Sequence, residues 1–166
     1  LQSYAQNPEW IHYTADKSVS SVVIDGNWVW VGTYGGGLIK ANRITGEKEV
    51  YIRTNSPIPG NGTLYLTEVN NNLWMSTGNN LVRFNGNNWT KFNSTNSPLP
   101  QNPADCLAAE NDSLLWIGNY STSPLAMYDG STWHDFEADY LGITNHGITA
   151  IAIDRDGVKS VSYTHL

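Results

Sequence analysis

Charge of either sign is scarce in this sequence, and long apolar runs are missing. Only 14% of the 166 residues are charged, and the formal net charge is -6 at pH 7. The nine Lys and Arg residues are scattered along the chain, whereas binding to phosphate backbones needs clustered positive charge. No apolar run reaches the roughly 18 residues of a membrane-spanning helix. We therefore expect no nucleic-acid partner and no membrane insertion by this segment.

Cysteine is almost absent. The single Cys106 cannot form an internal disulfide, and it lies in an alternating apolar run. Such a position predicts a buried, inert thiol. A cysteine nucleophile would need a nearby base, and the sequence gives no evidence of one.

Segments rich in Ala, Leu, Glu and Lys, which form helices most readily, are also missing. In their place the chain has 15 Gly, seven Trp and nine Tyr, with many Asn residues at turn-like positions. This composition is typical of an all-β protein with many turns.

Two short aromatic patterns repeat along the chain. The pattern Trp-Val-Gly-Thr that starts at Trp30 returns in related form at Trp74 and Trp116, 44 and then 42 residues further on. A second pattern, out of phase with the first, ends in Tyr or Phe; its copies are 10–13, 48–51, 89–92 and 133–136. Because two independent patterns share one period, we infer a structural repeat.

Each repeat divides into four strand-like runs separated by turn residues, as in one blade of a β-propeller. We predict an all-β fold, a partial β-propeller of about three and a half four-stranded antiparallel blades of about 43 residues. The predicted blades cover 19–54, 64–93 and 105–137, a fourth begins at 148, and the last strand of the first blade is expected over 48–54. Stacked blades cover each other's faces, so the repeated Trp should pack between blades.

The two ends of the chain carry further expectations. Residues 1–5 look like the remnant of a signal peptide, so the propeller would cover 6–160. The run 10–13 matches the outer strand of a blade and is predicted to close a ring whose remaining blades lie elsewhere. The residues VSYTHL at 161–166 resemble a translated sequencing adapter. The repeat fails where they begin, because the Trp expected near position 159 is missing, and we assign them no function.

Four stretches make the chain resemble a known repeat family. They are WVGTYGGGL at 30–38, NNWTKFNSTNSPLPQN at 87–102, LLWIGN at 114–119 and AIAIDRDG at 150–157. In these stretches the chain is similar to the two-component-regulator propeller repeats of exported bacterial proteins. The resemblance implies a β-propeller in an extracytoplasmic location, periplasmic or secreted. Such repeats occur in sensor regions of hybrid histidine kinases that respond to polysaccharide fragments, and in exported proteins with a C-terminal secretion domain. The resemblance also implies that the remaining blades and the downstream domains of the full-length protein are partners of this segment.

Several chemical sites can be weighed against a purely structural role. The glycines at 35–37 precede a strand and not a helix N-terminus, which argues against a phosphate-binding loop. The run 154–157 lacks the further oxygen ligands of a calcium loop and falls where a hairpin turn is due. The histidines lack metal-ligand spacing, and no catalytic pair or triad can be singled out. We expect no catalytic residues, no metal and no cofactor.

The remaining candidates lie on loops. In a propeller the loops between second and third strands and those between blades emerge on one face. On these loops lie the residues that we predict to bind ligand: Tyr34, Asn79, Asn119, Tyr120, Tyr140 and His146. Aromatic faces combined with amides suit neutral, hydroxyl-rich ligands such as saccharides.

Three hypotheses follow for function. The first is a non-catalytic extracytoplasmic binding or sensing module with recognition on this loop face. The second is a structural or adhesive propeller module of an exported multidomain protein. The third is a propeller enzyme, a lyase or glycosidase, with most catalytic residues outside this segment.

Overall fold

A computed structural model of the chain describes residues 18–100, 104–143 and 147–163. These residues form three four-stranded antiparallel sheets and one two-stranded sheet, and they contain no helix. The prediction of an all-β partial propeller of about three and a half blades is therefore confirmed. The described residues also hold no helix of the length and apolarity that crossing a membrane requires.

Each sheet is a meander in which consecutive strands pair. Blade 1 comprises β1 (Val19–Asp25), β2 (Trp28–Thr33), β3 (Leu38–Asn42) and β4 (Lys48–Tyr51). Blade 2 comprises β5 (Thr63–Val69), β6 (Asn72–Thr77), β7 (Asn80–Phe84) and β8 (Trp89–Phe92). Blade 3 comprises β9 (Cys106–Ala109), β10 (Leu115–Gly118), β11 (Leu125–Tyr128) and β12 (Trp133–Phe136). The start of blade 4 is the hairpin of β13 (Ile148–Ile153) and β14 (Lys159–Tyr163).

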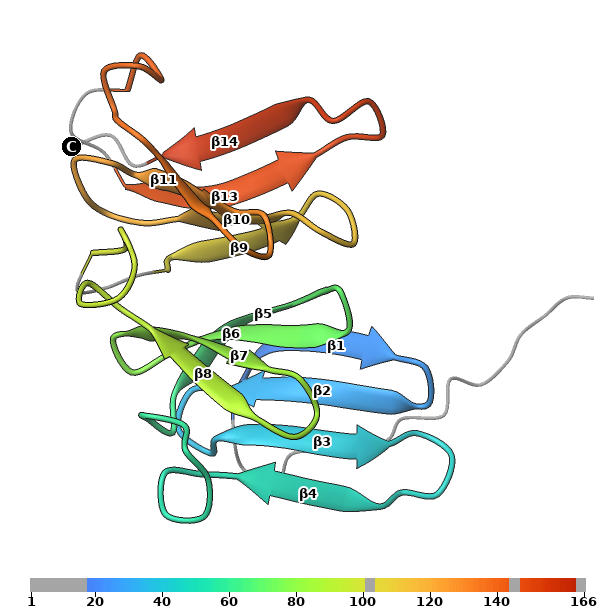
Figure 1. Cartoon of the computed structure of the whole chain (residues 1–166). Helices are drawn as coiled ribbons and strands as arrows, with labels where there is room; N and C mark the ends of the chain where they lie inside the picture. The colour runs from blue at the N-terminus through green and yellow to red at the C-terminus, as the bar shows by residue number, and fades with distance from the viewer. Residues whose placement is uncertain (1–17, 101–103, 144–146, 164–166) are drawn as a thin grey trace, which may run out of the picture.

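The first strands of the blades follow one another in space. Strand β1 contacts β5, β5 contacts β9, and β9 contacts β13. Figure 1 shows the sheets stacked in chain order, from blue blade 1 to the red hairpin. This is the arrangement of propeller blades around an inner edge made of first strands.

The repeated Trp residues fill the spaces between blades, as predicted. Trp30, Trp74 and Trp116 are all buried, and each belongs to a core cluster shared with the following blade. Apolar area removed from water in this way stabilises each junction by roughly 25 cal/mol per Å².

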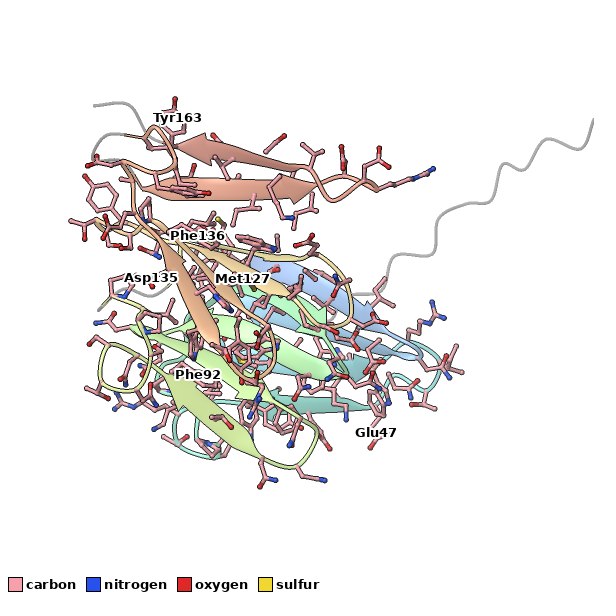
Figure 2. The ribbon with its side chains drawn as sticks, turned by 45° about the horizontal axis from the view of Figure 1, so that its top comes forward. Glu47, Phe92, Met127, Asp135, Phe136 and Tyr163 are labelled. Atoms are coloured by element: carbon pink, nitrogen blue, oxygen red, sulfur yellow. The ribbon has the colours of Figure 1, made fainter. Side chains whose placement is uncertain are left out.

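The second aromatic pattern packs on the first, which explains their common period. Tyr51, Phe92 and Phe136 on the fourth strands stack on the Trp of their own blade, with ring centroids 5.4 to 6.1 Å apart. Phe92 lies in the core between blades 2 and 3, and Phe136 lies in the core between blades 3 and 4 (Figure 2).

The residue two places after each Trp touches the next blade. A Cβ on Gly32 would lie 2.9 Å from the main-chain O of Thr63, and one on Gly118 would lie 2.9 Å from that of Ile148. Blade 2 has Ser76 here, and its hydroxyl donates to the main-chain O of Ala104 at 2.9 Å. Ser76, which stands where the other two blades have Gly, therefore adds a hydrogen bond between blades 2 and 3.

In the turn between β2 and β3, the backbone requires glycine at Gly37. Its φ is +86°, and an added Cβ would collide with the main-chain O of Tyr51. Gly35 has nothing within 4 Å of such a position. The close approach is thus to the outer strand of the same blade.

Some expectations for the ends lie outside the described residues, namely the signal-peptide remnant at 1–5 and the closing strand at 10–13. Part of 161–166 is described, since residues up to Tyr163 belong to β14 and pair with β13. Ser160 pairs with Ala152. In blades 1 and 3 the residue at the equivalent place in the first strand pairs with the repeated Trp. Ser160 therefore stands where the other blades have their Trp. The adapter hypothesis concerns the gene and stays a prediction.

Candidate functional site

The loops predicted to share a face do so. The turns after β2, β6 and β10 and the connections between blades gather on the left side of Figure 1. Hydrogen bonds tie the two kinds of loop together. The main-chain N of Gly37 donates to Asn61 O at 2.8 Å, and Thr77 Oγ1 donates to Gly60 O at 3.0 Å. These hydrogen bonds between loops therefore hold the backbone of this face in place.

A groove of about 320 Å³ opens on this face where blade 2 meets blade 3. We call it the loop-face groove; the lining residues used below are Gly62, Leu64, Gly78, Asn79, Ala104 and Asp105. They come from the connection before β5, the turn after β6 and the segment before β9. A volume near 300 Å³ is at the lower end for small-molecule sites.

The groove combines apolar, amide and carboxyl groups. Leu64 is exposed there, and Asn79 adopts a left-handed φ of +33°, which Asn tolerates better than most residues. Burial raises the pKa of the Asp105 carboxyl. Burial, and after it the charge of Asp105, raises the pKa of Tyr65 on β5. A hydroxyl-rich ligand would find both acceptors and an apolar surface here.

Tyr34 stands beside this groove. Its main-chain O lies within ordinary contact distance of a Cβ built on Gly62, and its side chain is 65% exposed. The fold thus places Asn79 in the lining of this groove and the backbone of Tyr34 next to Gly62 at its edge. The sequence analysis did not single out Leu64, Tyr65 and Asp105. All three lie near the start of the first strand of a blade, which borders the propeller axis, and this position could have pointed to them.

The other predicted residues lie elsewhere. Asn119 is 0% exposed; its Oδ1 accepts from Ser121 Oγ at 2.6 Å, and its Nδ2 has no partner within the described part of the chain. Tyr120 is exposed and packs against Gly147. Tyr140 is 81% exposed, and its ring centroid is 6.4 Å from that of Phe136. His146 is outside the described residues, and ligand binding by all these residues stays a prediction.

No metal centre or reactive thiol accompanies the groove. No group of three or more His, Cys, Asp or Glu side chains is arranged to hold a metal ion in the segments that the structure describes. Cys106 is buried, its Sγ donates to Ile148 O at 3.6 Å, and burial raises the pKa of its thiol to about 11. A thiol with such a pKa is a poor nucleophile near neutral pH.

Solved structures share this fold. The extracellular domain of a hybrid two-component system, BT3049 of B. thetaiotaomicron, aligns with a TM-score of 0.72 and 18% identity, over 88% of this chain and 20% of that chain. The extracellular domain of a one-component system, BT4673 of the same organism, gives 0.71 and 19% over 95% and 21%. The computationally designed Ika4 protein gives 0.62 and 13% over 92% and 94%.

These likenesses show the fold. The chain spans about a fifth of the length of the two bacterial domains. No protein-family model and no curated protein matches the sequence.

Proposed function

We propose that the chain is a non-catalytic, extracytoplasmic binding or sensing module of the propeller class. It takes a neutral, hydroxyl-rich ligand such as a saccharide at the loop-face groove. The observation that carries this proposal is that Asn79, Leu64 and Asp105 line one opening, with the backbone of Tyr34 beside Gly62 at its edge. The sensor role is supported by the shared fold with extracellular domains of bacterial one- and two-component systems.

The chemistry of the groove supports this ligand class over charged ones. Asp105 supplies a carboxyl acceptor, and in its ionised form this group would repel an anionic ligand beside it. Among the residues that the structure describes, no Lys or Arg lines the groove to compensate an anion. Leu64 and the exposed ring of Tyr34 provide surfaces for the apolar face of a sugar ring.

A glycan-array screen of the complete protein tests the proposal, followed by titration of each binding saccharide by calorimetry. We expect Tyr34→Ala and Asp105→Asn each to weaken binding about tenfold, which corresponds to about 1.4 kcal/mol. Ile44→Ala is the control, since this exposed side chain lies outside the groove and is not among the predicted binding residues. Absence of saccharide binding, or equal affinity of Tyr34→Ala and wild type, would contradict the proposal.

A further inference from the structure

A second groove, of about 260 Å³, lies at the opposite ends of the strands, between blades 1 and 2. It is bordered by the turns of the β1–β2, β5–β6 and β7–β8 hairpins, which lie on the right side of Figure 1. We call it the hairpin-face groove. It shares no lining residue with the loop-face groove.

Aromatic rings form the inner wall of this groove. Trp28 and Trp30 are two residues apart on β2, so both point to the blade 2 side. Phe84 of blade 2 meets Trp30 edge-on, with centroids 5.8 Å apart. The Nζ of Lys40, which pairs with Trp30 in the sheet, lies 4.3 Å from the ring centroid of Trp28 and 5.3 Å from that of Trp30. The ammonium group is therefore held on the two indoles by cation–π attraction.

Polar groups of mixed character form the rim. Asp25 of blade 1 and Glu68 of blade 2 place two carboxyl groups at the opening, and Asn71 and Asn85 place two amides there. Burial, and after it the nearby carboxylates of Asp25 and Asp112, raises the pKa of Glu68. The groove therefore offers acceptors from both blades and donors from the amides and from Lys40.

The next junction provides an internal comparison. The equivalent groove between blades 2 and 3 holds only about 100 Å³. By strand register Asn72 there takes the place of Trp28, and Ala109 that of Glu68. Tyr128 takes the place of Phe84, and its hydroxyl donates to Gly130 O at 2.7 Å across the hairpin turn. Blades thus pack on one another without the extra indole and carboxyl group, so stacking alone does not require them.

We propose that the hairpin-face groove is a second binding site, for one neutral, hydroxyl-rich ring such as a single residue of a saccharide. The apolar face of the ring packs on the side of Trp28. Its hydroxyls donate to Asp25 and Glu68 and accept from Lys40, Asn71 and Asn85.

Charge and size exclude the other ligand classes. Two carboxyl groups repel an anion, and a ligand cation would have to displace Lys40 from the indoles. A volume below the usual 300 to 1,000 Å³ of small-molecule pockets suits one small ring rather than an extended ligand.

Variants taken from the chain's own repeats test this site in the complete protein. Trp28→Asn and Glu68→Ala install the residues that the equivalent junctions carry, so both are compatible with blade packing. Neutral oligosaccharides of glucose, galactose, mannose, xylose and N-acetylglucosamine are screened by tryptophan fluorescence and titrated by calorimetry. We expect binding that Trp28→Asn weakens at least tenfold and Glu68→Ala about fivefold.

Two controls separate this site from its surroundings and from the proposed function. Asn72→Ala alters the equivalent position of the neighbouring junction and should change this affinity less than twofold. In Tyr34→Ala, the binding component that Trp28→Asn weakens should remain, whereas any component that Tyr34→Ala removes belongs to the loop-face groove. Near-ultraviolet circular dichroism checks that each variant keeps its aromatic packing. The proposal is overturned if no oligosaccharide binds, if Trp28→Asn and Glu68→Ala both bind like the wild type, or if only Tyr34→Ala abolishes binding. The last result would leave the loop-face groove as the saccharide site.

Discussion

At the scale of single residues, Cys106 makes the fold sensitive to alkaline pH. Burial raises the pKa of its thiol to about 11 in the folded chain, against about 8.5 for an unfolded cysteine. The folded state therefore favours the neutral thiol. Its contribution to stability is complete below the unfolded-state pKa and is lost as the pH rises toward the folded value.

The free energy of unfolding, measured by urea titration, should thus fall between about pH 8.5 and 11, and fall less in Cys106→Ala. The comparison uses slopes against pH, because the substitution also removes packing. Equal slopes in the two proteins would assign the pH dependence to other groups, such as Tyr65, whose pKa burial also raises.

Gly118 allows blade 4 to approach blade 3. A Cβ at this position would lie 2.5 Å from Cys106 Sγ and 2.9 Å from Ile148 O. We expect Gly118→Ala to reduce the free energy of unfolding by about 1 to 3 kcal/mol, as overpacking typically does. Gly35→Ala is the control, because nothing lies within 4 Å of its added Cβ, and it should change stability by less than about 0.5 kcal/mol. Equal stabilities of the two variants would contradict the close packing of blades 3 and 4.

At the scale of elements, the connections between blades are turns held by side-chain hydrogen bonds. Asn96 closes the turn after β8, where its Oδ1 accepts from Asn93 N and its Nδ2 donates to Lys91 O, both at 2.9 Å. Asn55 makes the equivalent bonds after β4. Ile58 and Leu99, which each directly follow a proline in these connections, are buried.

Replacement of the Asn96 side-chain amide should therefore lower the free energy of unfolding. We expect Asn96→Ala to lower the free energy of unfolding by about 1 to 3 kcal/mol, since each lost hydrogen bond contributes about 0.5 to 1.5 kcal/mol. Asn96→Asp, which keeps the acceptor but not the donor, should lose about half as much. Unfolding experiments in guanidinium measure the difference, and no loss in Asn96→Ala would show that the turn holds without the amide.

These turns also explain where sequence reasoning erred on element ends. A strand was expected over 48–54, yet β4 ends at Tyr51 because Ile52 begins the turn that Asn55 closes. The strand order and the buried Trp residues were predictable, since they follow from local alternation and from the repeat period. The grooves were not, because they depend on which residues of adjacent blades face each other. The sequence alone gave no sign that Trp28 and Glu68, or Tyr34 and Gly62, would meet.

At the scale of the whole molecule, blade 1 carries an apolar face on its outer side. Val22 and Ile24 on β1 are 53% and 63% exposed. By register they lie on the same face as Val29, Val31 and Ile39, which are themselves buried. Exposed apolar patches of this kind mark association surfaces. The predicted ring would cover this face with another blade.

The 166-residue chain on its own should therefore self-associate. Light scattering coupled to size exclusion measures its mass, and we expect species larger than a monomer that diminish in the double variant Val22→Thr with Ile24→Lys. The control is Val158→Thr, an exposed apolar residue outside this face. A monodisperse monomer that unfolds cooperatively would contradict the expectation.

The residue that follows each Trp by two positions restricts how these repeats can be recombined. Gly118 faces Ile148, whose Cγ2 would lie 2.7 Å from any added Cβ, whereas Ser76 needs the carbonyl of Ala104 to accept its proton. A gene rearrangement that joined blade 2 directly to blade 4 would set the serine side chain against Ile148 and leave its hydroxyl without that acceptor. The repeats look alike in sequence, yet the contacts at their junctions differ, so each blade is matched to the neighbour that follows it.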